Sequence, residues 1–253
     1  MKQLPNLLTL GNLCCGCIAL VCILQAPDFT TLYNGQSYIV TAPEPLAWGG
    51  FWIAMAAVFD FLDGLAARVL GAHSPLGKDL DSLSDLVSFG VAPGMILYQL
   101  LKISFISHSG AINTSVAGLL PALLVPSFCA VRLARFNQAG SGKDYFSGIP
   151  APAAGLLVAS FPLILLRDDL HLSPALGNFW ILYAIIAVDC YFMVCRLPMI
   201  SLKFRDLKWS GNQPRYFLIA GAIAGILLLG FAAVPAVYIF YIILSLIFKP
   251  LRS

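Results

Sequence analysis

The stretch D-F-L-D-G-L-A-A-R at residues 60–68, followed by G-K-D-L-D-S-L-S-D at residues 77–85, decides how this chain is organised. It places Asp60, Asp63, Asp81 and Asp85 at helical spacing in a sequence that is otherwise strongly apolar. Charged side chains are costly inside a bilayer and are usually kept there for function. The stretch therefore predicts a polar site within a membrane protein.

Composition places the whole chain in the membrane. Of the 253 residues, 59% are hydrophobic and only 11% are charged, whereas about 25% of the residues of a typical soluble domain are charged. We expect an all-α integral membrane protein whose partners are substrates and membrane lipids, with no nucleic acid. A bilayer core about 30 Å thick requires helices of roughly 20 residues. Eight apolar segments predict such helices, at residues 7–25, 47–70, 81–104, 113–135, 150–167, 177–196, 214–231 and 234–248.

The basic residues predict the orientation of these helices. With the N-terminus inside, the inner side receives Lys2, Arg68, Lys78, Arg132, Arg135, Lys143, Arg196, Lys203, Arg205, Lys208, Arg215, Lys249 and Arg252. The outer side keeps only Lys102 and Arg167. Because Lys and Arg accumulate on the cytoplasmic side, we expect an inner-membrane protein with both termini and the aspartates facing the cytoplasm. The connection at residues 26–48 would be an ordered external loop.

Helical periodicity brings the aspartates onto shared faces. Asp60 and Asp63 lie at i and i+3, and Asp81 and Asp85 lie at i and i+4. If residues 69–77 form a turn between antiparallel helices, the two carboxylate faces meet across a cleft. Carboxylates that converge in a low dielectric either take up protons or hold cations. Oxygen ligands suit hard ions such as Mg2+, Mn2+ or Ca2+, and a pair of Mg2+ ions usually serves phosphate chemistry.

The pattern D-x-x-D-G-x-x-A-R, then eight residues, then G-x-x-x-D-x-x-x-D, resembles the signature of the CDP-alcohol phosphatidyltransferases. The resemblance implies a six-helix catalytic core within residues 1–205 and leaves residues 206–253 as an additional C-terminal hairpin. It also implies CDP-diacylglycerol as the donor and two Mg2+ or Mn2+ ions as cofactors. We expect a homodimer.

The family pattern suggests roles for individual residues. Asp60, Asp63 and Asp81 would bind metal, and Asp85 would bind metal and accept the proton of the attacking hydroxyl. The donor would be contacted by the following residues: Asn12, Gly64, Ala67, Arg68, Gly77 and Lys78. Gly64 and Ala67 would leave room for the cytidine diphosphate, Arg68 and Lys78 would offset phosphate charge, and Gly77 would let the second helix start close against the first.

Four further motifs resemble the phosphatidylserine synthase branch of the family. They are P-N-L-L-T-L-G-N-L at residues 5–13, S-F-G-V-A-P at 88–93, R-L-A-R-F-N at 132–137 and F-S-G-I-P-A-P-A-A at 146–154. Arg132 and Arg135 share a helix face, and guanidinium groups bind carboxylates bidentately. They are therefore candidates to bind the serine carboxylate, while headgroup contact by snorkelling is the alternative.

Two other features are open to more than one interpretation. Asp189 lies deep in the sixth predicted helix, where a structural ion pair with Arg132 or Arg135 is favoured over a catalytic role. Gly221 and Gly225 form a G-x-x-x-G that fits close helix packing or a dimer contact.

Two alternatives to serine transfer remain from the sequence. The acceptor could be glycerol 3-phosphate or inositol phosphate, although these acceptors call for more basic residues around the pocket. The carboxylates could instead form the ion site of a cation transporter, but no internal repeat typical of transporters is visible.

Overall fold

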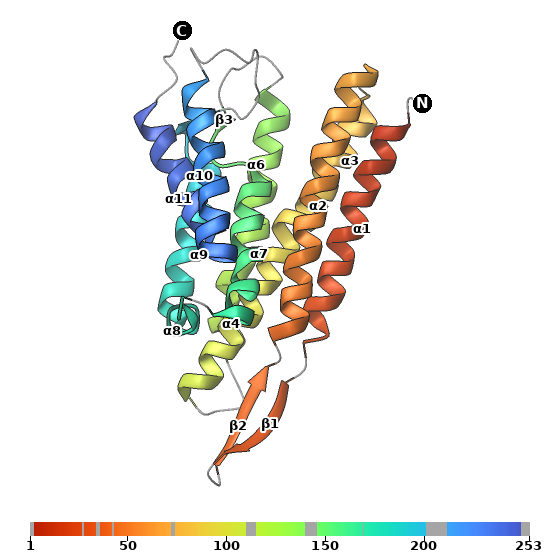
Figure 1. Ribbon diagram of the computed structural model, residues 1–253. Helices are drawn as coiled ribbons and strands as arrows, with labels where there is room; N and C mark the ends of the chain where they lie inside the picture. Colours follow the sequence, from red (N-terminus) through yellow and green to blue (C-terminus); the bar gives the residue numbers. More distant parts are fainter. Residues whose placement is uncertain are drawn as a thin grey trace.

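The computed structural model describes residues 3–26, 28–33, 36–41, 43–71, 74–109, 115–139, 146–168, 170–200 and 212–248. Within these ranges the chain is a bundle of long helices, with two short antiparallel strand pairs in the connections (Figure 1). The helices are α1 (Leu4–Leu24), α2 (Pro43–Leu70), α3 (Pro75–Leu86), α4 (Ala92–Ser109), α5 (Val116–Leu119), α6 (Leu124–Ala139), α7 (Ala151–Arg167), α8 (Ser173–Leu176), α9 (Phe179–Val194), α10 (Gln213–Leu229) and α11 (Ala233–Ile247). The strands are β1 (Asp28–Tyr33) paired with β2 (Gln36–Thr41), and β3 (Phe146–Ser147) paired with β4 (Pro198–Met199).

Each predicted span corresponds to one long helix or to consecutive helical segments. A π-helical turn, Val87–Val91, joins α3 to α4, and 3-10 turns join α5 to α6 and α10 to α11. In the part of the chain that the structure describes, four runs are long and apolar enough to cross a membrane: Leu4–Leu24, Pro75–Ser107, Val116–Gln138 and Gln213–Ile247. Together with the shorter apolar helices α7 and α9, they make this an all-α integral membrane protein.

The turn between α2 and α3 is tighter than predicted. After α2 ends at Leu70, Gly71 adopts a φ of 59°, a left-handed conformation that glycine adopts without steric cost. Ser74 then caps α3 by accepting a hydrogen bond of 3.0 Å from the Gly77 N–H, with Pro75 in the first turn. The predicted start at residue 81 was wrong because Lys78 and Asp79 lower the hydropathy without breaking the helix.

Helix α1 supports the two carboxylate-bearing helices, since it packs against both α2 and α3. On its other side α2 packs against α7. At the contact of α2 with α7, a Cβ at Gly50 would clash with the carbonyl oxygen of Ala159. Where α7 meets the π-helical turn, a Cβ at Gly155 would lie 3.0 Å from the Phe89 Cα. Small residues allow such close helix contacts in membranes. The fully buried Phe89 therefore fixes the π-helical turn against α7.

The connection between α1 and α2 is an antiparallel hairpin of β1 and β2, and α2 already begins at Pro43. At the other end of the chain, α10 and α11 pack on one another. A Cβ at Gly221 would lie 2.7 Å from Phe240 Cε1, and one at Gly225 would lie 3.3 Å from Ala233 Cβ. The G-x-x-x-G therefore serves packing within the chain.

Some sequence predictions fall outside the described residues. These are the domain boundary between residues 205 and 206 and the basic residues Lys2, Lys143, Lys203, Arg205, Lys208, Lys249 and Arg252.

Candidate active site

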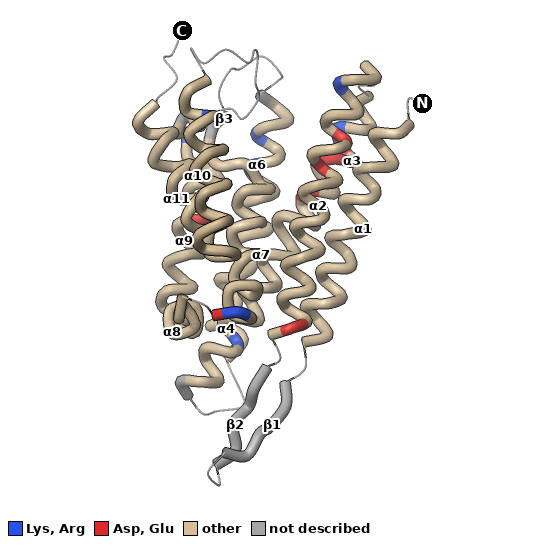
Figure 2. The backbone as a smooth tube through the Cα atoms, viewed as in Figure 1, with Lys and Arg blue, Asp and Glu red and all other residues tan. Residues whose placement is uncertain are grey.

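The structure brings three of the four aspartates together. One carboxylate oxygen from each of Asp60 and Asp63 on α2 and Asp81 on α3 lies within 4.8 Å of the others. Asp63 is buried, while Asp60 and Asp81 are partly buried. The carboxylate faces of α2 and α3 therefore lie against each other, as predicted from the sequence. Figure 2 shows these acidic segments near the end of the bundle where both termini lie, with the basic segment of α6 at a similar level.

Asp85 lies beside this cluster, one turn further along α3. Its side chain is 7% exposed, and its Oδ1 accepts a hydrogen bond of 3.1 Å from Asn12 Nδ2. It remains within electrostatic range of Asp60 and Asp81. The fourth carboxylate is thus held by α1 at the edge of the group formed by the other three.

Helix α1 also holds one member of the cluster itself. The Thr9 hydroxyl lies 2.7 Å from Asp63 Oδ2 and 3.0 Å from the carbonyl oxygen of Pro5. Thr9 is 4% exposed and Asn12 is fully buried. Thr9 was not among the predicted site residues, although its spacing of three residues from Asn12 in an apolar helix indicates a shared polar face.

The π-helical turn follows directly on the carboxylates of α3. It contains Ser88, Phe89 and Gly90 of the S-F-G-V-A-P motif. The Ser88 hydroxyl donates to the carbonyl oxygen of Asn12 at 3.1 Å, and a Cβ at Gly90 would lie 3.2 Å from Cys129 Cβ on α6. π-helical turns often occur at functional sites. This turn connects α3 to α1 and α6 around Asp85.

The donor set fits a hard divalent cation. It consists only of carboxylate oxygens, which Mg2+ and Mn2+ prefer over softer ligands. Oδ1 of Asp81 is buried and has no hydrogen-bond partner within the described ranges, and leaving a buried acceptor unsatisfied is unfavourable. A cation bound by this oxygen would remove that cost and the repulsion between the carboxylates.

The glycines proposed to contact the donor differ in their surroundings. A Cβ at Gly64 would meet no atom within 4 Å, so open space lies beside α2 at this position, and Ala67 one turn later is partly buried. A Cβ at Gly77 would instead lie 3.0 Å from Asn6 Oδ1 and from Ser74 Oγ. The close approach at Gly77 is therefore to α1 and to its own helix cap, and the expected approach to α2 was wrong.

Arg68 and Lys78 lie near the open end of α2 and α3. Arg68 is exposed, and its Nε donates to the carbonyl oxygen of Gly64 at 2.9 Å. Lys78 Nζ donates to the carbonyl oxygen of Asn137 at 2.8 Å, and Asn137 Nδ2 donates to Ser82 Oγ at 2.7 Å. The end of α6 is thereby tied to the first half of α3.

The two arginines of α6 have different environments. Arg132 is 9% exposed, its Nε has no hydrogen-bond partner among the described residues, and it is near enough to Asp85 and Asp60 to interact with them electrostatically. Arg135 is exposed, and its Nη1 donates to the carbonyl oxygen of Val194 at 3.1 Å. Arg132 is therefore the buried arginine of the pair, whereas Arg135 connects α6 to the end of α9.

The partner predicted for Asp189 was wrong. Asp189 is 1% exposed, and its Oδ1 accepts a hydrogen bond of 2.7 Å from the Tyr238 hydroxyl on α11. Its Oδ2 has no partner among the described residues. The aspartate thus connects α9 to the C-terminal hairpin. This contact could not be predicted from local sequence spacing, because Tyr238 lies 49 residues after Asp189.

A known protein family matches most of the chain. The model of the family described as CDP-alcohol phosphatidyltransferase matches residues 2–194. The chain belongs to this family. The match includes every helix that carries a cluster residue and leaves out α10 and α11.

Individual family members resemble the chain over most of its length. It is 34% identical over 180 residues to the CDP-diacylglycerol–serine O-phosphatidyltransferase of Bacillus subtilis, covering 68% of this chain and 85% of that protein. It is 30% identical over 200 residues to the protein of the same name from Mycobacterium leprae, covering 76% of this chain and 61% of that protein. A yeast protein of that name, from Saccharomyces cerevisiae, is 30% identical over 194 residues, covering 62% and 66%.

Proposed function

We propose that this protein transfers the phosphatidyl group of CDP-diacylglycerol to the hydroxyl of L-serine, giving phosphatidylserine and CMP. The observation that carries this proposal is the convergence of Asp60, Asp63 and Asp81 within 4.8 Å. The choice of serine is supported by the names of the similar proteins from B. subtilis, M. leprae and S. cerevisiae.

Asp60, Asp63 and Asp81 would hold the divalent metal, Mg2+ or Mn2+, with Asp85 at its edge as a further ligand in a site for two ions. When bound, the metal would neutralise phosphate charge and help to align the reacting groups. The open space beside Gly64 and Ala67 would receive the cytidine diphosphate, close to Arg68. Lys78, Gly77 and Asn12 would shape the site mainly through their contacts with α6, α1 and Asp85.

The transfer forms one bond and breaks one. The serine Oγ attacks the phosphorus that is esterified to diacylglycerol, and the bond from this phosphorus to the oxygen bridging to CMP breaks. CMP departs with the electrons of that bond, and the proton of the serine hydroxyl goes to Asp85. Asn12 would orient the Asp85 carboxylate through its hydrogen bond of 3.1 Å to Oδ1, because positioning of the base comes before its basicity.

Serine carries a carboxylate that the site must recognise. Arg132 is buried near Asp85, and its Nε has no hydrogen-bond partner in the part of the chain that the structure describes, so it is suited to binding this carboxylate. Arg135 already donates to the Val194 carbonyl. We therefore assign the main contact with serine to Arg132 and a supporting role to Arg135.

The bias of basic residues supports a site that opens to the cytoplasm from the inner membrane, because CDP-activated donors and CMP would then meet on the cytoplasmic side. Residues 1–205 would form the catalytic domain and residues 206–253 an added hairpin. The homodimer expected from the family stays a prediction.

The deciding experiment measures CMP release by the purified protein in detergent with CDP-diacylglycerol and each of four acceptors. We expect release with serine and little with glycerol 3-phosphate, inositol or inositol phosphate. Preference for a phosphorylated acceptor would overturn the assignment of serine. If no acceptor gave CMP while the protein carried divalent ions across vesicle membranes, the transporter alternative would replace the enzyme.

A further inference from the structure

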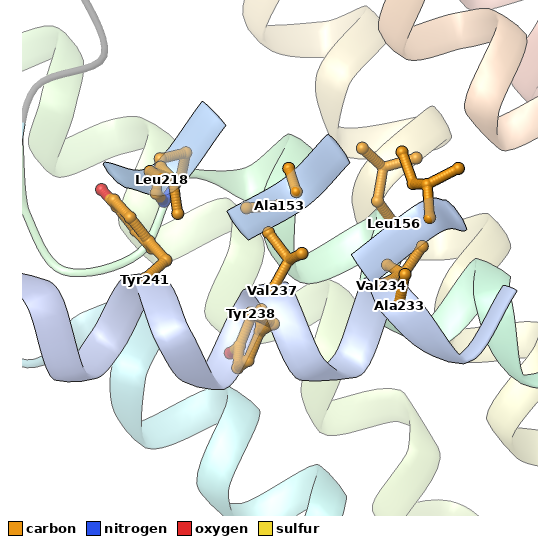
Figure 3. Close-up of a pocket in the computed structure, with 11 residues that line it drawn as sticks. Ala153, Leu156, Leu218, Ala233, Val234, Val237, Tyr238 and Tyr241 are labelled. Atoms are coloured by element: carbon orange, nitrogen blue, oxygen red, sulfur yellow. The ribbon is translucent and has the colours of Figure 1, made fainter. Parts of the chain in front are cut away.

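An apolar groove of about 230 Å³ lies between α7 and the C-terminal hairpin. Figure 3 shows side chains from three helices facing it: Ala153 and Leu156 of α7, Leu218 of α10, and Val237 and Tyr241 of α11. The groove is partly open to the surface, and its lining is almost wholly apolar.

The two tyrosines of the groove turn their polar ends to other partners. The Tyr238 hydroxyl donates to Asp189 Oδ1 at 2.7 Å, and the Tyr241 hydroxyl donates to the carbonyl oxygen of Ile200 at 3.0 Å. Both hydroxyls are satisfied within the protein, so the rings offer the groove only carbon surface. A polar ligand would find few hydrogen-bond partners there.

The groove is elongated along the helices. Its lining on α11 extends from Ala233 to Tyr241, and its lining on α10 extends from Leu218 to Ile226. Eight helical rises correspond to about 12 Å along the helix axis. An apolar channel of this length, parallel to membrane-spanning helices, has the shape of an extended hydrocarbon chain.

One end of the groove, at Tyr241, points toward the end of the bundle that carries the carboxylates. Helix α11 runs toward the end where both termini lie, and the acidic segments of α2 and α3 lie near that end (Figures 1 and 2). The other end, at Leu156, Ile226 and Ala233, lies further along the helices, away from these charges. A molecule with a charged head at the carboxylates and an apolar tail would therefore have its tail directed into the groove.

Helix α10 leaves room for such a tail because it is loosely covered. None of its residues is buried, and it is held by α11 through the close contact of Gly221 with Phe240. In a bilayer, acyl chains are the apolar molecules available to pack against the walls of such a groove.

We propose that the groove between α7 and the α10–α11 hairpin binds one acyl chain of the CDP-diacylglycerol donor. This inference rests on the proposed function and extends it, because the hairpin lies outside the residues matched by the family model. The hairpin thereby becomes part of the binding site for the lipid substrate.

The test compares two alanine substitutions on the same helix. Ala222 lines the groove, so Ala222→Leu places a larger side chain in it, whereas Ala224 is exposed and Ala224→Leu is the matched control. Overpacking a filled apolar site weakens binding by roughly 5- to 150-fold. We expect Ala222→Leu to raise the KM for dipalmitoyl CDP-diacylglycerol about tenfold and to leave the KM for the dibutyryl donor unchanged. Ala224→Leu should change neither.

Equal changes with both donors, or no change with either, would overturn the proposal for the groove. Serine-dependent CMP release by the wild-type protein is measured in the same experiment. Its absence would reject the proposed function itself, so the two failures are distinguishable.

A second measurement does not depend on the folding of a variant. A CDP-diacylglycerol with a diazirine within one acyl chain is photolysed with the wild-type protein, and the labelled peptides are identified by mass spectrometry. Labelling of α7, α10 and α11 that an excess of unlabelled donor suppresses supports the proposal. Labelling confined to other helices, or labelling that an excess of phosphatidylcholine suppresses equally, indicates a different chain site or a bulk lipid and overturns it.

Discussion

Thr9 Oγ1 lies 2.7 Å from Asp63 Oδ2, so a hydroxyl on the first helix holds a carboxylate of the cluster across 54 residues of sequence. The same helix holds Asp85 through Asn12. Outer contacts of this kind orient metal ligands and influence their affinity. Helix α1 is therefore a positioning element of the site, although it contributes no carboxylate.

Removing the Thr9 hydroxyl should weaken metal binding without abolishing the fold. Thr9→Val keeps the shape of the side chain, and loss of an outer contact usually lowers metal affinity by about 10- to 100-fold. We expect the Mg2+ concentration for half-maximal activity to rise in that range, while Thr9→Ser, which retains the hydroxyl, stays near the wild type. An unchanged Mg2+ dependence in Thr9→Val would show that Asp63 needs no such support.

Asparagine at Asp60, Asp63 or Asp81 should abolish most activity and also reduce the stabilisation by metal. A ligand that binds only the folded state raises its melting temperature, and the rise increases with the affinity. Each variant should therefore show a smaller rise in Tm on addition of Mg2+, while its Tm without metal does not fall because one repelling carboxylate has been removed. Asp79→Asn is the control, since Asp79 is exposed on α3, the helix that carries Asp81. A variant that retains full activity and the full Mg2+ shift would remove that residue from the site.

Much of this site could be predicted because the required information is local. The spacing of Asp60 and Asp63, and of Asp81 and Asp85, follows from helical periodicity, and a short turn brings the two faces together. The contacts of Thr9 with Asp63 and of Tyr238 with Asp189 depend on packing between distant helices. Periodicity within one helix contains no information on such partners.

The start of α3 shows a different limit. Hydropathy marks the apolar part of a helix, whereas its true beginning is determined by capping. Ser74 followed by Pro75 is a capping pattern that the sequence contains, and in the structure Ser74 accepts a hydrogen bond from the Gly77 N–H. Such a pattern is sufficient to predict the start of α3. The π-helical turn at Val87–Val91, in contrast, depends on the packing of Phe89 against α7, which spacing alone does not reveal.

The orientation in the membrane can be tested with introduced cysteines. In a background from which the seven native cysteines are removed, Leu76→Cys lies on an exposed position of α3 and Leu170→Cys on an exposed position after α7. We expect an impermeant thiol reagent added to intact cells to label residue 170 and not residue 76. Permeabilised cells provide the control, because both positions should then react. The reverse pattern in intact cells would place the carboxylates on the external side.

Substitutions at Arg132 and at Arg135 should change the KM for serine to different extents, although both residues belong to one motif. Arg132 is buried near Asp85, and no described residue accepts a hydrogen bond from its Nε, while Arg135 is exposed and donates to the Val194 carbonyl. Loss of a hydrogen-bonded contact with a charged group costs about 1.5–3 kcal/mol, or roughly 10- to 150-fold in binding. We expect Arg132→Lys and Arg132→Gln to raise the KM for serine by such a factor and to change the KM for CDP-diacylglycerol far less. Lysine keeps the charge but lacks the planar guanidinium, so a strong effect of Arg132→Lys would indicate bidentate recognition of the carboxylate.

Arg135→Gln should instead lower the Tm slightly, with a smaller change in either KM. If the Arg132 variants left the KM for serine unchanged, or weakened only the lipid substrate, Arg132 would have to be reassigned to the donor phosphates.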